Sequence, residues 1–187
     1  MSKGLSLSDG GGLEVFHYSL TVIPDGMEQA GARAINRALQ HGRKVAWDTV
    51  KAEYKLKRTY FYNVVKTYKA HKEVLDGSIE ARSTHLPLEK FPHRPGAGDT
   101  TGANRRQIRV GIKQGETLKP LKTGFIYQGR ILRRKNGEGR KAQYAFSPAV
   151  AQILGFDDIY DRVYEEMEET FFRRLDHEIE HEINRKY

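Results

Sequence analysis

Cysteine is absent from the 187 residues of this chain, and tryptophan occurs once. The lack of cysteine excludes disulfides, thiolate nucleophiles and cysteine-ligated zinc. Long apolar runs are also missing, because no stretch approaches the roughly 20 residues that a membrane helix needs. Residues 1–12 lack the apolar core of a secretory signal. The sequence therefore predicts a protein that is made and used in water and has no membrane partner.

Catalytic patterns are scarce. The sharpest match is HEIEH at residues 177–181, which fits H-E-x-x-H and would place His177 and His181 on one helix face, as two zinc ligands require. The surrounding segment is so rich in glutamate that such a match arises easily by chance. The glycine clusters at 10–12 and 96–98 lack the spacing of a phosphate-binding loop. We therefore predict no catalytic residue, no metal and no cofactor, and hence no enzyme.

Charge is abundant, and it is unevenly distributed. The formal net charge is +8. Residues 28–72 hold eleven Lys and Arg against three Asp and Glu, and residues 101–141 hold twelve against two. Residues 151–187 reverse the sign, with five against eleven. Such segregation favours contact of the basic part with nucleic acid, or contact of opposite charges between copies of the chain; each run also fits a plain solvated face.

Length and composition predict one globular α+β domain over residues 13–187, preceded by a flexible arm at residues 1–12. The arm is rich in Ser and Gly and cannot order itself without a partner. Residues 13–23 mix β-branched and aromatic side chains and predict a strand, which ends at the turn signal of residues 24–26.

Two helices are predicted next, forming an N-terminal helical pair. Residues 27–54 carry an apolar stripe at three- and four-residue steps, and Gly42 within it indicates either a weakened or bent helix or a close helix contact. A second helix is predicted from Thr59 onward, with Phe61, Val64, Val65 and Tyr68 on one face.

The middle of the chain predicts a small antiparallel β-sheet. Glycine and proline exclude long helices there, and residues 91–104 predict a long polar loop. Strands are predicted at residues 78–82, 108–112 and 125–132 from β-type patterns. Asn136-Gly137 predicts a hairpin, with a return strand at residues 144–146.

The C-terminal part predicts two helices. Pro148 and Gly155 bound a short one at residues 149–154. A long one begins at Asp157, with apolar residues at four-residue spacing: Ile159, Val163, Met167, Phe171, Leu175, Ile179 and Ile183. It is expected to pack on the sheet or on the first helix.

Two sets of charged residues are candidates for contact with other macromolecules. The candidate interface between copies of the chain comprises Glu165, Glu166, Glu168, Glu169, Arg133 and Arg134. The candidate nucleic-acid contacts are Arg43, Lys44, Lys51, Lys55, Arg58, Arg130, Arg133, Arg134 and Lys135. The joint at residues 54–59 lacks the glycine usual in a helix-turn-helix, which counts against specific DNA binding. The basic residues still supply phosphate affinity, and a cytoplasmic basic DNA-binding module is therefore the alternative function.

The order of several short segments carries a family resemblance. AINRA at residues 34–38 and VAWDT at residues 45–49 precede a basic helix, and Leu86-Pro87 and GFIYQ at residues 124–128 follow before the long terminal helix. From about residue 27 onward this order resembles the minor tail protein Z family of lambda-like long-tailed phages.

The resemblance implies a tail completion component without catalytic residues. It would be assembled in the host cytoplasm, reside in the tail of the virion near its head-proximal end, and act in head–tail joining. Its expected partners are other phage tail proteins and further copies of itself in a ring, with non-specific contact to phage DNA as an additional expectation.

Overall fold

The computed structural model describes residues 6–8, 12–19, 27–82, 85–94, 107–135 and 141–186. Its internal contacts divide the chain into two compact units. Unit 1 consists of Met1–Val50, Thr59–Ser83 and Val150–Tyr187, and unit 2 consists of Lys51–Arg58 and Thr84–Ala149. An N-terminal helix, several small antiparallel sheets and a long C-terminal helix confirm the predicted α+β class. The single domain over residues 13–187 stays a prediction. α1 (Glu28–Glu53) runs from unit 1 into unit 2.

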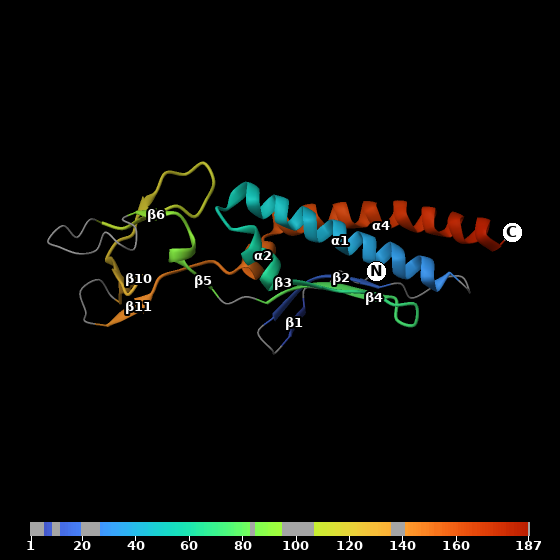
Figure 1. The fold of residues 1–187 in the computed structure, drawn as a ribbon, viewed down its shortest axis with the longest axis horizontal. Coiled ribbons are helices and arrows are strands. Elements are labelled where there is room, and N and C mark those ends of the chain that lie inside the picture. Colours follow the sequence, from blue (N-terminus) through green and yellow to red (C-terminus); the bar gives the residue numbers. More distant parts are fainter. Residues whose placement is uncertain are drawn as a thin grey trace. The chain divides into compact units, whose positions relative to one another are not determined.

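The two long helices of unit 1 lie side by side and run in opposite directions (Figure 1). Arg33, near the start of α1, reaches Glu178 and Glu182 near the end of α4 (Asp157–Lys186). Alanine is frequent along the buried stripe of α1, where its small side chain combines high helix propensity with close packing. Both long helices and the short α3 (Val150–Leu154) confirm predictions from the sequence. Within the described ranges, no helix is long and apolar enough to cross a membrane.

Gly42 is a point of close contact between α1 and α4. A Cβ atom built on Gly42 would overlap the Cγ and Sδ atoms of Met167. Of the alternatives predicted for this glycine, the structure supports the close helix contact. Any side chain at residue 42 would therefore force Met167 or the helices to shift.

The sheet of unit 1 has the strand order β1-β2-β4-β3 and is antiparallel throughout. β2 (Gly12–Ser19) confirms much of the strand predicted at residues 13–23, and the rest of that range and the turn at 24–26 lie outside the described residues. β1 (Ser6–Ser8) belongs to the predicted arm and pairs with β2. The other residues of the arm up to residue 11 also lie outside the described residues. β4 (Asp76–Ala81) confirms the strand predicted at residues 78–82.

The second predicted helix is wrong beyond its first two turns. α2 (Arg58–Val64) ends after seven residues, and β3 (Val65–Tyr68) continues the chain as a strand. β-Branched Val65 and Thr67 and aromatic Tyr68 favour extended backbone. Pairing with β4 and complete burial of Val65 then outweigh the helical spacing that the sequence shows.

The apolar seam of α4 is buried only in its first half. Ile159, Val163, Met167 and Phe171 are buried, whereas Leu175 and Ile179 are half-buried and Ile183 is 44% exposed. A four-residue step turns an α-helix by about 40° more than a full turn, so strict four-residue spacing drifts around the helix. Because of this drift, the last residues of the predicted seam leave the face that packs inside unit 1.

The described residues of unit 2 form three small antiparallel sheets rather than one. Their orders are β6-β7-β8, β11-β10-β9 and β12-β5. The strands and the single-turn helix are β5 (Leu86–Pro87), η1 (Leu88–Lys90), β6 (His93–Arg94), β7 (Arg109–Val110), β8 (Lys119–Pro120), β9 (Gly124–Tyr127), β10 (Arg130–Arg134), β11 (Ala142–Tyr144) and β12 (Phe146–Ser147). Their core contains Leu86, Phe91, Ile108 and Ile131.

Several strand boundaries in unit 2 differ from the predictions. The strand predicted at residues 125–132 is a hairpin, because Gln128 and Gly129 have φ angles of 48° and 74° and reverse the chain between β9 and β10. Only two residues of the predicted strand at 108–112 pair as a strand. The predicted return strand at 144–146 is divided between β11 and β12, since buried Ala145 interrupts it.

Two further predictions in unit 2 meet the limits of the described residues. The predicted hairpin around Asn136-Gly137 is confirmed by the antiparallel pairing of β10 with β11, although its tip at residues 136–140 lies outside the described residues. The loop predicted at residues 91–104 begins with β6 and is not described beyond residue 94.

Candidate functional site

The four candidate interface glutamates lie in the middle of α4. Glu165, Glu166 and Glu169 are exposed, and Glu168 is half-buried. Glu166 lies 3.2 Å from His41 Nε2, and Glu169 lies 3.8 Å from Arg173 one turn further along. These are surface pairs in contact with water, so they contribute little to the stability of the fold. The carboxylates therefore present an acidic strip on unit 1, which we call the α4 acidic strip (Glu165, Glu166, Glu168 and Glu169).

The HEIEH segment has a structural role in this fold. Arg33 Nη1 donates to Glu178 at 3.2 Å and to Glu182, a buried carboxylate, at 2.9 Å. The hydrogen bond to Glu178 is the largest of the effects that raise the pKa of Arg33. His177 and His181 are exposed, and the described residues contain no group of three or more His, Asp or Glu suited to a metal ion. Glu178 thus joins α4 to α1.

The basic residues predicted around the helical pair are divided between the two units. Arg43 donates to the carbonyl oxygens of Tyr62 at 3.0 Å and Val65 at 2.6 Å, and its guanidinium lies 4.6 Å from the centre of the Tyr62 ring. It therefore secures the junction of α2 and β3. Lys44 is exposed on unit 1, while Lys51, Lys55 and Arg58 belong to unit 2. Lys55 Nζ donates to the carbonyl oxygen of Glu116 at 2.9 Å.

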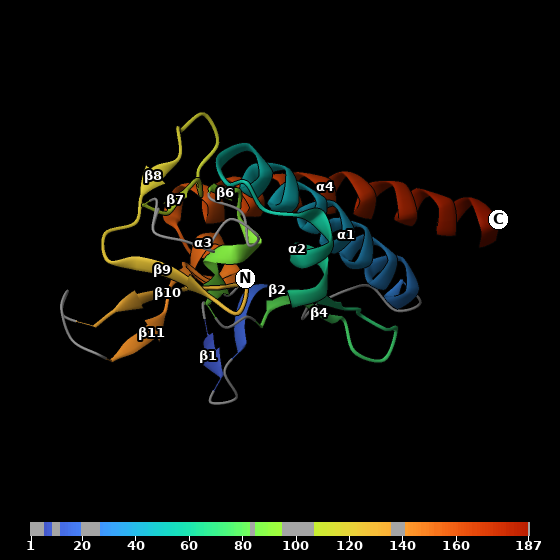
Figure 2. The same cartoon turned by 60° about the vertical axis from the view of Figure 1, so that its left-hand side comes forward.

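The remaining candidate cations lie in β10 or directly after it. β10 belongs to the β9–β10–β11 sheet, which Figure 2 shows as a ribbon. Arg130, Arg133, Arg134 and the adjacent Lys135 are all exposed. Because side chains alternate along a strand, Arg133 lies on the face of buried Ile131, whereas Arg130 and Arg134 lie on the opposite face. The sheet therefore carries cations on both faces.

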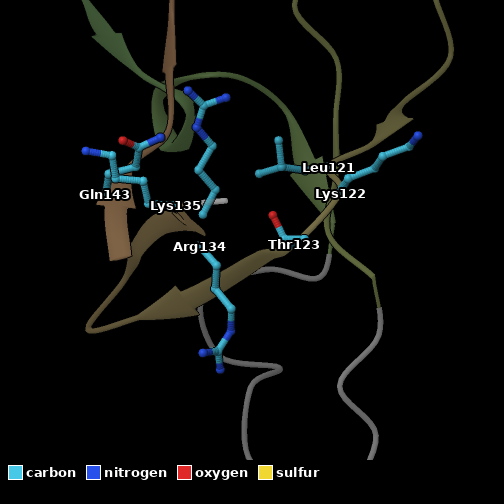
Figure 3. A pocket seen from close by; sticks show the side chains of 7 residues that line it. Leu121, Lys122, Thr123, Arg134, Lys135 and Gln143 are labelled. Carbon is cyan, nitrogen blue, oxygen red and sulfur yellow. The ribbon is translucent and has the colours of Figure 1, made fainter. Parts of the chain in front are cut away.

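A groove of about 510 Å³ borders one end of this sheet (Figure 3). Four of its lining residues are cations and none is acidic; the lining consists of Leu121, Lys122, Thr123, Arg133, Arg134, Lys135 and Gln143. With the Gln143 amide turned so that its oxygen faces Arg133, the oxygen accepts hydrogen bonds from Nε at 2.9 Å and Nη2 at 3.2 Å. In Figure 3 the Arg134 side chain points away from Leu121 and Gln143.

The opposite face of the sheet combines arginines with aromatic rings. Register places Phe125, Tyr127, Arg130, Arg134 and Tyr144 on this face, which we call the open face. Arg130 donates to the Tyr144 hydroxyl at 2.5 Å with its Cζ 5.4 Å from the ring centre, and Arg134 Cζ lies 5.7 Å from that of Phe125. Tyr127 is 60% exposed and Tyr144 42%. Cation–π contacts hold the two arginines against the sheet.

The aromatic members of the open face were not predicted as contact residues. The signal was present in the alternation of Phe125 and Tyr127 with Gly124 and Ile126, and of Arg130 with Ile131. Interpreting it required the turn at residues 128–129, which sets the β9–β10 register. Without that turn, the aromatic side chains and the arginines cannot be assigned to one face.

The two units differ in sign of charge. Unit 2 holds eighteen Lys and Arg against five Asp and Glu, a formal charge of +13. Unit 1 holds fourteen against nineteen, a formal charge of −5. The basic excess of segment 28–72 is divided between the units, because residues 51–58 belong to unit 2, and the part that stays in unit 1 is outweighed there by the acidic α4.

Comparison of the chain with protein-family models, with curated proteins and with solved structures gives no match.

Proposed function

We propose that this protein is a structural component of a phage tail, a minor tail or tail completion protein acting near the head-proximal end in virion assembly and head–tail joining. The observation that carries the proposal is the opposite charge of the two units, −5 and +13. Identical copies in a ring meet through two different surfaces, and these must complement each other. The α4 acidic strip and the basic β9–β10–β11 sheet meet that requirement.

The apolar surface of α4 supports the same proposal. Phe172 is 45% exposed and Ile183 is 44% exposed, on a helix whose seam is otherwise directed into unit 1. Leu175 and Ile179, half-buried, lie between them. Apolar side chains next to a charged rim are typical of protein–protein interfaces. We therefore assign the contact between copies to the second half of α4 together with the acidic strip.

The order of AINRA, VAWDT, Leu86-Pro87 and GFIYQ before a long terminal helix also supports the tail assignment. VAWDT contributes Trp47, whose ring centre lies 5.4 Å from that of Phe61. It thus acts through packing, as expected of a structural component.

Sedimentation of the full chain at increasing salt tests the electrostatic contact. We expect association to weaken with salt and to fall by about tenfold when Glu165, Glu166, Glu168 and Glu169 are changed to lysine, because charges of like sign then face each other. Adding Arg133→Glu and Arg134→Glu to the same chain should restore association. Association that is insensitive to salt and to the four reversals would rule out this contact.

Virions assembled without the protein provide the second test. Negative-stain images should show defective or unjoined tails, and adding the purified protein should restore joining. Normal infectious particles would contradict the tail assignment. Monomers that bind duplex DNA with sequence preference would instead favour the alternative, a basic DNA-binding module.

A further inference from the structure

We propose that the open face of the β9–β10–β11 sheet binds single-stranded nucleic acid. Unpaired bases would stack on Tyr127, Tyr144 and the neighbouring Phe146, while Arg130 would pair with the phosphates. This site shares the β9–β10–β11 sheet with the proposed contact between copies, but it uses the aromatic rings and Arg130, whereas that contact is tested at Arg133 and Arg134.

Exposure of aromatic side chains is the first observation behind the site. Among the described residues of unit 2, three large apolar side chains are exposed: Tyr127 at 60%, Tyr144 at 42% and Phe146 at 49%. All three are aromatic, and all lie on or directly beside the same sheet. A solvent-exposed group of large rings rimmed by polar residues marks an interaction surface.

The rings form a row with a cation at one end. The ring centres of His85 and Phe146 are 6.1 Å apart, and those of Phe146 and Tyr144 are 6.0 Å apart. Arg130 Cζ follows at 5.4 Å from the Tyr144 ring, and Tyr127 is the cross-strand partner of Arg130. Successive π-faces on a sheet are the arrangement on which successive bases of a single strand stack.

Charge identifies the partner as a polyanion. The described residues of unit 2 hold fifteen Lys and Arg against three Asp and Glu. None of those acids lies in β9, β10 or β11. Phosphates supply the complementary charge, and their affinity for Lys and Arg arises largely from counterion release.

The aromatic rings decide between kinds of polyanion. An acidic protein surface offers carboxylates but no set of planar rings at regular spacing. A duplex hides its base faces inside the stack, so it would reach the cations only through phosphates. A single strand offers both phosphates and free base faces, and it is therefore the partner that uses the whole open face.

Fluorescence anisotropy of the full chain with a labelled oligo(dT) of twelve nucleotides, at about 50 mM salt, tests the site. We expect tighter binding of the single strand than of the matching duplex. Y127A and Y144A should each weaken oligo(dT) binding by roughly tenfold, the effect typical of losing one stacked base. Tyr68→Ala is the matched control, because Tyr68 is a strand tyrosine of unit 1 with 46% exposure; it should leave binding unchanged.

Conservative and charge variants sharpen the test. Y127F keeps the ring and should retain oligo(dT) affinity, whereas Y127A should lower it. A purely electrostatic site would bind oligo(dT) equally well in both variants. Arg130→Ala should reduce the slope of log affinity against log salt by about one. Circular dichroism of each variant confirms that unit 2 remains folded.

Three outcomes would overturn the site: equal affinity for duplex and single strand, unchanged binding in Y127A together with Y144A, or displacement of oligo(dT) by poly-glutamate as effective as displacement by unlabelled strand. Sedimentation of Y127A and Y144A separates this proposal from the tail role, because both substitutions keep the charges of the proposed contact, namely the α4 acidic strip, Arg133 and Arg134: association should persist while oligo(dT) binding falls.

Discussion

Unit 1 and unit 2 differ both in how their cores are built and in what their surfaces carry. Unit 1 uses long elements, with 26 residues in α1 and 30 in α4, and buries Phe61, Met167 and Phe171. Among the described strands of unit 2 the longest is β10, with five residues. Long elements bury many side chains for each turn of chain, whereas short strands leave more backbone and more side chains at the surface. In unit 2 these short strands carry the exposed rings of Tyr127 and Tyr144 beside the arginines of β10.

The contrast between buried and exposed parts of α4 should produce the largest effect on stability. Phe171 is fully buried and Phe172 is 45% exposed, so the adjacent residues form a matched pair. Phe171→Ala should lower the free energy of unfolding by about 3–5 kcal/mol through lost burial and a cavity. Phe172→Ala should change it by about 0.5 kcal/mol or less in dilute monomer. Urea unfolding measures both, and equal losses would refute this division of the helix.

Phe172→Ala also sharpens the assembly proposal. If the exposed half of α4 contacts another copy, this substitution should weaken association although it leaves the monomer stable. Sedimentation at several protein concentrations measures that effect.

Two glycines compare steric and conformational constraints in the two units. Gly42→Val in unit 1 should cost about 1–3 kcal/mol, because the new side chain overlaps Met167. Gly129→Ala in unit 2 should cost about 1–2 kcal/mol for another reason: residue 129 has a φ of +74° but nothing within 4 Å of a Cβ. Thermal unfolding of each variant measures the losses. Met167→Ala should reduce the loss caused by Gly42→Val, because it removes the overlapping side chain. Gly129→Asn should cost less than Gly129→Ala, because asparagine tolerates a positive φ. Failure of both rescues would contradict the steric and conformational explanations.

The smallest expected effect concerns one exposed ion pair of unit 2. Hydrogen bonding from Lys119 at 2.9 Å is the main cause that lowers the pKa of Glu116. A lowered folded-state pKa means that the pair stabilises the fold above the ordinary pKa of the carboxyl and loses this contribution as pH falls through the folded-state pKa. NMR titration should show the Glu116 pKa moving back up in Lys119→Ala. An unchanged Glu116 pKa in this variant would show that Lys119 does not cause the lowering.

Much of the helical structure could be predicted because its signals are local and long. The apolar stripe of α1 and the apolar four-residue spacing of α4 each extend over several turns, so single unfavourable residues do not change the outcome. Val65–Tyr68 was mispredicted because its helical spacing is local, while its strand pairing depends on residues 76–81 further along the chain. A similar limit applies to Gln128, whose positive φ has no strong signal in its residue type.

The candidate sites were predictable in part. The cations of β10 follow from composition, as do the glutamates of α4. The hydrogen bonds of Arg43 to two carbonyl oxygens, and of Arg33 to Glu178, could not be predicted from composition, because each partner lies on a different element. The open face depends on the β9–β10–β11 register, which only the paired strands define.

The sequence by itself determined the number of charges, the lack of thiol chemistry, and the positions of the long helices, since these depend on residue types and short-range periodicity. Tertiary structure alone decided which segments share a unit: residues 51–58 join residues 84–149, and the acidic α4 joins α1. That grouping gives unit 1 a formal charge of −5 and unit 2 a formal charge of +13. Strand pairing in unit 2 brings arginines and aromatic rings to one face of a sheet. The physical reason is that packing and strand pairing join residues far apart along the chain, where local patterns carry no information.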